Sequence, residues 1–455
     1  MSELKRSLSL KDAISIVAGS MIGSGIFIVS SHIARDTNSA ILLIITWCIA
    51  GIITLLGALC YGELSSTIPS EGGQYIYLKK IFNEKIAFIY GWTLFLVIQT
   101  GTLAAVNIAM AKFMGLVFPF ISSSNILFNI SNFSISTQQI FAIIAVLILT
   151  FINSKGVKAG VIVQNIFTLT KVLSILIIIF CGIFLGIDIN VVISNFSLAN
   201  NNIAFDFNTF KAIFTSLVGA LFASITWNNV TFISSEIKKP EKNIKIALTI
   251  GTLLVISLYF LLNMIYLTSL PLELIKTSPE DIVVAQLMHT IFGHKTLVII
   301  AIVIVISALG CANGMILTGS RVYYKMAKDR IFFRSLAYIE RKTKVPKNSL
   351  WLQCFWICVL ILWGNYAQLL DYVLYSSIIF YVITIFGIFK MRKKFPRNEK
   401  TFKVPNFIPI TFIVLTSILI VVLTLYKPLY TVPGLFISLL GIPVYHLWKR
   451  KPNKL

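Results

Sequence analysis

Long apolar runs, separated by short polar clusters, follow one another along the whole 455-residue chain. A helix needs roughly 20 apolar residues to cross a membrane, so each run predicts a membrane-spanning helix. Twelve spans are predicted, at residues 12–34, 40–66, 86–118, 138–153, 161–187, 210–234, 246–270, 296–324, 350–364, 369–389, 406–426 and 431–448. The pattern therefore predicts an all-α polytopic membrane protein whose loops hold no soluble domain.

Composition supports a bilayer environment. The chain is 57% hydrophobic and 12% charged, whereas soluble domains carry about 25% charged residues. The net charge of +22 would suggest a nucleic-acid or acidic partner in a soluble protein. Here the Lys and Arg residues lie between the apolar runs, and no basic stripe alternates with aromatics. We therefore expect the lipid bilayer as the surroundings and no nucleic-acid partner.

The basic residues are distributed unevenly between the two sides of these spans. With the N-terminus inside, 32 of the 39 Lys and Arg residues fall in inner segments and six on the outside or at outer helix ends. Lys171 alone lies within a span. Because cytoplasmic loops are enriched in Lys and Arg, we expect a multi-pass protein of the cell (plasma or inner) membrane with both termini in the cytoplasm.

The first span is interrupted at Gly23-Ser24-Gly25. Each glycine weakens a helix by about 1 kcal/mol relative to alanine. If the helix opens there, the freed backbone groups are tolerated in a membrane only where they line a cavity or meet a ligand. The new helix N-terminus that follows suits a carboxylate. The alternative is a face of small residues for close helix packing.

The sixth span carries a polar stretch at residues 224–229. Carbonyl groups freed near Phe222, Ala223 and Ile225 would accept hydrogen bonds from an ammonium group. One break that offers N–H groups and another that offers carbonyls together match a zwitterion. Interrupted helices at matching positions predict an inverted repeat, with residues 1–187 as spans 1–5, 188–390 as spans 6–10, and 391–455 as spans 11–12 and the tail.

Other polar residues within the spans, among them Lys171, Gln99, Asn107 and Asn313, are further candidates for function. A buried ammonium is costly in a membrane and indicates function by default, so Lys171 would replace a coupling cation and bind carbonyls freed at the first break. The alternative is that Lys171 extends to the cytoplasmic interface. Gln99 and Asn313 would line the transport path, or else form hydrogen bonds between helices. No metalloprotease, hydrolase or P-loop motif occurs, so we expect neither an enzyme nor a cofactor, and no metal site.

These residues resemble a known family. Residues 20–27 are similar to the first helix of the amino acid–polyamine–organocation superfamily. Phe222, Ala223, Trp227 and Asn228, followed by residues 236–240, resemble its sixth helix. Residues 313–314 and 320–321 resemble its eighth helix, and residues 402–405 and 441–445 resemble its L-type amino acid transporter branch.

The resemblance implies a LeuT-like fold of twelve helices, a five-plus-five inverted repeat with helices 1 and 6 discontinuous, and alternating access. It implies carboxylate contacts at Ser24 and Gly25. The implied substrate-binding residues are Met21, Ile22, Gly23, Ser24, Gly25, Phe222, Ala223, Ser224, Ile225 and Asn228, with ammonium contacts at the carbonyls of Met21, Phe222, Ala223 and Ile225. Phe222 would be a gate, Tyr372 matches an aromatic position near the outer pocket, and Lys171 aligns with the lysine that replaces sodium in sodium-independent members.

Two departures from the family pattern bear on selectivity and partners. Ile225 stands where the family usually has a small residue, so it would narrow the side-chain pocket and favour small or medium neutral amino acids. Residues 119–137 lack the cysteine with which animal L-type light chains bond a heavy chain. We therefore expect no disulfide-linked partner, as in a prokaryotic member that works alone.

The sequence thus predicts a sodium-independent amino acid transporter that exchanges neutral, small-to-medium L-amino acids. The alternative is a proton-coupled amino acid or amine symporter of the same fold. A sensor would be expected to carry an output domain and a channel a pore-lining repeat, and the sequence shows neither.

Overall fold

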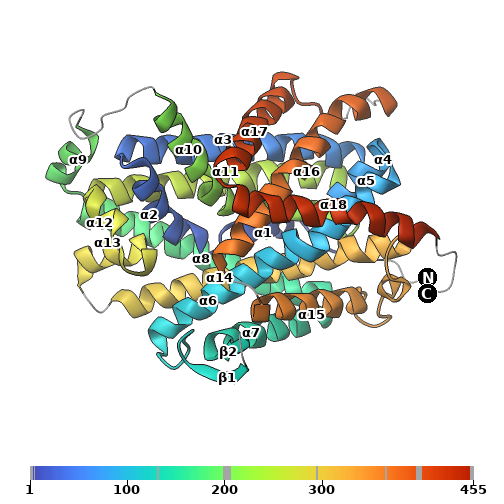
Figure 1. The fold of residues 1–455 in the computed structure, drawn as a ribbon, viewed down its shortest axis with the longest axis horizontal. Coiled ribbons are helices and arrows are strands. Elements are labelled where there is room, and N and C mark those ends of the chain that lie inside the picture. The colour runs from blue at the N-terminus through green and yellow to red at the C-terminus, as the bar shows by residue number, and fades with distance from the viewer. Residues whose placement is uncertain are drawn as a thin grey trace.

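The protein is a bundle of long helices in the computed structural model (Figure 1). The structure describes residues 4, 6–130, 133–197, 206–293, 296–363, 366–395 and 402–450. The helices of the first half are α1 (Leu10–Met21), α2 (Gly25–Thr37), α3 (Ala40–Thr67), α4 (Gln74–Ile81), α5 (Glu84–Thr93), η1 (Leu94–Ile98), α6 (Gln99–Val117), α7 (Thr137–Ser154), α8 (Val157–Cys181), η2 (Gly182–Gly186) and α9 (Ile189–Phe196). The helices of the second half are α10 (Phe207–Phe222), η3 (Ile225–Glu236), α11 (Pro240–Ser269), α12 (Leu272–Lys276), η4 (Pro279–Asp281), α13 (Val283–Phe292), α14 (Thr296–Lys328), η5 (Arg334–Ala337), α15 (Lys347–Trp363), α16 (Tyr366–Lys394), α17 (Phe407–Tyr426) and α18 (Pro428–Arg450).

The predicted spans coincide with these helices. In the described part of the chain, ten helices are long and apolar enough to cross a membrane, and the bent pair α1–α2 makes an eleventh. The predicted ninth span corresponds to α15, which has only 17 residues. The structure therefore supports a helical membrane protein, while the count of twelve spans stays a prediction.

One expected loop contains strands. Residues 119–137 include an antiparallel hairpin of β1 (Ile126–Ile130) and β2 (Phe133–Ser136), in which Asn129 pairs with Ser134. In β2 the sequence Phe-Ser-Ile-Ser alternates apolar and polar residues, which is typical of a strand with two different faces. The predicted all-α fold class is therefore confirmed, and the hairpin adds two short strands to a loop without changing the helical bundle.

Local sequence signals place the ends of several helices. Ser9 caps α1, where its side chain and that of Asp12 form a reciprocal capping box, which satisfies N–H groups that have no partner within the helix. Ser136 and Gln139 do the same for α7. Pro240 begins α11, where its missing N–H removes no helical hydrogen bond. These polar residues mark the turns between apolar runs.

The surface of α8 shows how the bundle meets the bilayer. Ile162, Ile166, Leu169, Leu173 and Ile177 are spaced three or four residues apart and are all exposed. Residues at this spacing lie on one helix face, and a continuous exposed apolar face of this length fits lipid rather than water. The opposite face of α8 is buried and carries Lys171.

Candidate functional site

The first helix of the bundle breaks where the sequence predicts. Helix α1 ends at Met21 and α2 begins at Gly25, with a bend of 40° between them. Across the described residues, the N–H groups of Gly23, Ser24 and Gly25 have no hydrogen-bond acceptor. Because these groups lie at the N-terminus of a 13-residue helix, they form a site of partial positive charge that suits a carboxylate.

The sixth span breaks directly against the first. Helix α10 ends at Phe222, and after Ala223 and Ser224 the chain continues as the 3₁₀ helix η3. A Cβ atom added to Gly25 would lie 2.8 Å from the Cβ and 3.0 Å from the Cα of Ala223. The two interrupted backbones are therefore in contact, and this approach requires glycine at position 25.

Hydroxyl groups satisfy several carbonyls that the breaks release. The hydroxyl of Tyr259, on α11, lies 3.1 Å from the carbonyl oxygens of both Met21 and Ala223. Its single proton serves one of them at a time, and each carbonyl has two lone pairs. The hydroxyl of Tyr381 donates to the carbonyl of Ile225 at 2.9 Å. These oxygens therefore keep lone pairs for an ammonium group.

Lys171 joins α8 to the first break. Its Nζ donates to the carbonyl oxygens of Gly19 and Ile22, each at 2.6 Å, and to that of Ser307 at 3.2 Å. The side chain is 1% exposed, so it does not extend to the surface. The lysine side chain fits here because residue 310 on α14 is a glycine. A Cβ atom added to Gly310 would lie only 3.0 Å from the Nζ atom of Lys171. The three N–H donors of the ammonium group are thus met by three carbonyl oxygens. A coupling cation at this place would be bound by the same kind of oxygen ligands.

A small cavity, with a volume of about 20 Å³, adjoins the second break. Its wall includes Ile225 and Asn228 on η3, Gln99 on α6, and Leu94 and Ile98 of η1, which is a π-helical turn between α5 and α6. Such π-helical turns often occur at functional sites, and this one was not foreseen from the sequence because no glycine or proline marks it.

The other predicted site residues lie in different places. Phe222 packs against Val97 and Val373. Asn228 is engaged with Gln74 and Tyr381. The side chain of Tyr372 lies outside the described residues. Ile22 and Ser24 are buried at the first break, and Ser224 donates to carbonyls of its own helix turn.

Asn313 lies away from the cavity wall. Its side chain bonds to Asn153 at 2.8 Å, Gln164 at 2.8 Å and the carbonyl of Gly160 at 3.1 Å, which links α7, α8 and α14. Gln99 does line the cavity, and its amide also donates to the carbonyl of Met315 at 2.9 Å. The structure therefore brings Gln99 to the cavity and places Asn313 in an interhelical network.

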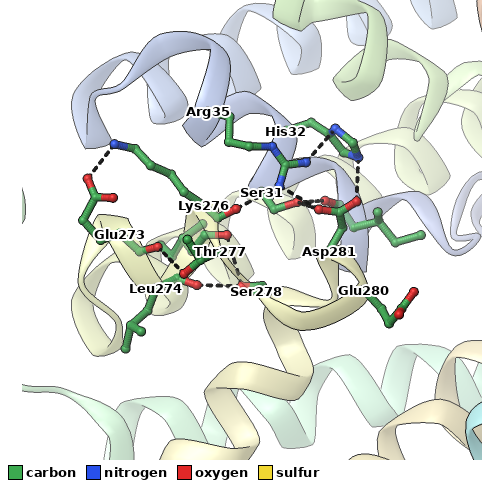
Figure 2. A network of polar contacts seen from close by, with 12 residues as sticks. Ser31, His32, Arg35, Glu273, Leu274, Lys276, Thr277, Ser278, Glu280 and Asp281 are labelled. Carbon is green, nitrogen blue, oxygen red and sulfur yellow. Dashed lines mark hydrogen bonds and ion pairs between the residues drawn. The ribbon is translucent and has the colours of Figure 1, made fainter.

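A cluster of polar contacts, which we call the Asp281 cluster, fastens α2 to the segment between α11 and α14 (Figure 2). Asp281 accepts from Arg35 at 2.7 Å and from Ser31 at 3.2 Å, and it lies 3.3 Å from His32. Burial raises the pKa of Asp281, but hydrogen bonds from Arg35 and Ser31 and the nearby positive charges outweigh it, so the net pKa is below its usual range. A second pair, Lys112 and Glu280, connects this segment to α6 at 2.8 Å.

A buried ion pair lies at the end of η3. Arg321 on α14 donates to Glu236 at 2.8 Å, and both side chains are fully buried. The backbone carbonyl of Glu236 also accepts from Ser7 and Leu8, so the segment before α1 is held against η3. Both charged residues stand in segments that resemble the family, but their pairing depends on how η3 and α14 pack and has no signal in the sequence.

Comparisons with known proteins agree with these features. The sequence profile of a family described as "Amino acid permease" matches residues 8–442. The mouse (Mus musculus) large neutral amino acids transporter small subunit 2 is 30% identical over 99% of this chain and 83% of its own length. The mouse b(0,+)-type amino acid transporter 1 is 29% identical over 94% and 84%, and the mouse Asc-type amino acid transporter 1 is 27% identical over 99% and 83%. These relatives are named as transporters, not enzymes.

Proposed function

This chain belongs to the amino acid permease family, and we propose that it is a sodium-independent exchanger of neutral, small-to-medium L-amino acids. It is a transmembrane protein of amino acid transport. The observation that carries the proposal is the contact between the two broken helices at Gly25 and Ala223. It brings free N–H groups beside carbonyls with spare lone pairs, which is the complement of an amino acid zwitterion.

In this proposal the substrate carboxylate binds the N–H groups of Gly23, Ser24 and Gly25. Its ammonium binds carbonyls of Met21, Phe222, Ala223 and Ile225. Ser24 is 3% exposed, so the carboxylate would be held away from water, where hydrogen bonds to charged groups contribute more. No ionised side chain is then needed to recognise either end of the substrate.

Sodium independence rests on Lys171. Its ammonium already occupies three carbonyl oxygens beside the first break. A sodium ion at the same position would meet a fixed positive charge, which is unfavourable at short range in a low-dielectric interior. We infer that Lys171 supplies permanently what a coupling cation would supply on each cycle.

The arrangement in the membrane is part of the same proposal. Residues 1–187 and 188–390 would form two inverted halves that rock around the site, followed by residues 391–455, with both termini in the cytoplasm of a prokaryotic-type cell. The chain would work without a disulfide-linked heavy chain, because residues 119–137 contain no cysteine.

The test is radiolabelled amino acid flux in liposomes that contain the purified protein. An exchanger takes up label only when unlabelled amino acid is inside, and a pH gradient does not change its rate. Uptake into empty liposomes that is driven by an inward proton gradient would instead establish the proton-coupled symporter. Preference for Trp or Phe over Ala and Ser would refute the proposed size selectivity.

A further inference from the structure

An exposed apolar face of α7 ends in a lysine. Ile144, Ile148 and Phe151 are spaced three or four residues apart and are all exposed, so they lie on one helix face. Lys155 follows four residues after Phe151, and its Nζ lies 4.5 Å from the centroid of the Phe151 ring. The ammonium group of Lys155 therefore lies at the end of a helix face that is suited to lipid.

Two other helices repeat this arrangement. The lipid-facing side of α8 begins at Ile162, and Lys158, four residues earlier, is exposed. On α15, Lys347, Trp351 and Phe355 are spaced by four residues and are all exposed. Each of the three helices thus carries an exposed apolar face with a lysine at one end.

The three lysines lie at the same end of the bundle. A turn of two residues joins α7 to α8, with Lys155 within it and Lys158 just after it. Helix α15 packs beside α7 (Figure 1). The loop that leads to Lys347 touches the turn, because a Cβ atom added to Gly156 would lie 3.7 Å from the carbonyl oxygen of Thr343. We call the exposed faces of α7, α8 and α15, together with these three lysines, the lysine-headed wall.

Positive charge gathers at this end of the wall without acidic partners. The cationic residues here are Lys155, Lys158, Arg341, Lys342, Lys344 and Lys347. Across the described residues, none of the six forms an ion pair with an acidic side chain. The carboxylate of the neighbouring Glu340 accepts from the backbone N–H of Arg341 at 3.0 Å. Helices α8 and α15 also begin here, and helix N-termini add partial positive charge. The patch therefore favours an anionic ligand.

We propose that the lysine-headed wall binds an anionic phospholipid. Its phosphate lies among Lys155, Lys158 and Lys347, and its acyl chains lie along the apolar faces of the three helices. Basic pockets between transmembrane helices on the cytoplasmic side are suited to such head groups, and this is the end of the spans that the sequence predicts to be cytoplasmic. The inference goes beyond the proposed function, because it does not depend on what the protein transports.

Lipid binding to the purified protein provides the test. Native mass spectrometry from a non-ionic detergent counts the lipids that stay bound while either phosphatidylglycerol or phosphatidylcholine is titrated. The two lipids share the phosphate, but the choline cation offsets its charge. The wild type is expected to bind one phosphatidylglycerol about tenfold or more tightly than phosphatidylcholine, since each lysine near an anionic head group contributes appreciably.

Two double variants locate the site. Lys158→Gln with Lys347→Gln removes two positive charges from the wall and is expected to weaken phosphatidylglycerol binding by about tenfold or more. The matched control is Lys11→Gln with Lys80→Gln, which removes the same charge at two exposed lysines on α1 and α4. Its affinity for phosphatidylglycerol should stay at the wild-type value. Thermal unfolding of each protein in the same detergent shows whether it is folded, and the comparison of the two lipids on the wild type stands without any variant.

Several results would overturn the proposal. Equal affinity of the wild type for the two lipids, or an equal loss of affinity in both double variants, would show that only the general positive charge of the protein attracts anionic lipid. Displacement of phosphatidylglycerol by an equal concentration of inorganic phosphate would show a site for free phosphate that makes no use of the apolar faces. A dimer that is lost in the Lys158→Gln, Lys347→Gln protein would make the wall an interface between two copies of the chain. None of these results bears on amino acid exchange, which the liposome flux assay tests separately.

Discussion

Replacing Gly25 with alanine should push apart the two backbone segments that touch at Gly25 and Ala223. The added Cβ would lie 2.8 Å from the Cβ and 3.0 Å from the Cα of Ala223, where ordinary contact begins near 3.4 Å. The backbone of one break must therefore shift by about half an ångström. Overpacking of this kind costs about 1–3 kcal/mol, which corresponds to a factor of about 5–150 in an equilibrium constant. We expect a loss of exchange of that size in liposomes.

Alanine substitutions at two other glycines, Gly23 and Gly62, serve as controls for Gly25→Ala. A Cβ on Gly23 would meet only Cys311, at 3.5 Å and 3.7 Å, so Gly23→Ala should reduce exchange far less than Gly25→Ala. A Cβ on Gly62, in α3, would have its nearest contact at 3.4 Å, and Gly62→Ala should leave both exchange and thermal stability near wild type. Measuring the thermal unfolding of each variant in detergent shows whether it folds. A Gly25→Ala protein as active as the wild type would refute the contact between the breaks.

Three further substitutions test the polar groups that support the site. Lys171→Ala leaves buried carbonyls without their charged donor and should lower exchange by about tenfold or more, since such hydrogen bonds contribute about 1.5–3 kcal/mol; full activity would contradict its role. Glu236→Gln removes the charge that pairs with buried Arg321 and should cost up to about 3–5 kcal/mol of stability. Glu280→Gln breaks an exposed ion pair and should cost less than about 1 kcal/mol. Equal melting temperatures of the two variants would contradict the difference between the buried and the exposed pair. Asp281→Asn should lower the free energy of unfolding by at most about 1 kcal/mol. Because the pKa of Asp281 is lowered in the folded protein, its carboxylate stays charged from pH 8 to 5. The stability difference between wild type and variant should therefore persist over that range and vanish only as the pH falls below about 4. A difference that disappears near pH 6 would show that another group is responsible.

The breaks and the spans could be predicted because their signals are local. Gly23 and Gly25 weaken the helix wherever it packs, and the apolar run lengths fix where helices cross a bilayer. Lys171 was noticeable because a single ammonium in an apolar run is rare and needs partners.

The supporting groups could not be predicted because they depend on how the helices pack. Tyr259 is one of many aromatic residues in the spans, and only tertiary structure places its hydroxyl between Met21 and Ala223. The same holds for Leu94 and Tyr381, which come from different spans and both line the cavity. The π-helical turn at residues 94–98 has no mark in the sequence, since its five residues are ordinary apolar ones. Their packing roles become visible only in the folded bundle.

The central claim is that the two breaks recognise both ends of a zwitterion, and competition by truncated substrates tests it most directly. Exchange of labelled L-alanine is measured with excess unlabelled L-alanine, with ethylamine, which lacks the carboxylate, and with propionate, which lacks the ammonium. The account predicts that only L-alanine inhibits at comparable concentrations, because each analogue leaves one set of backbone groups unpaired. Inhibition by ethylamine as strong as that by L-alanine would contradict carboxylate recognition at Gly23, Ser24 and Gly25 and would favour an amine transporter.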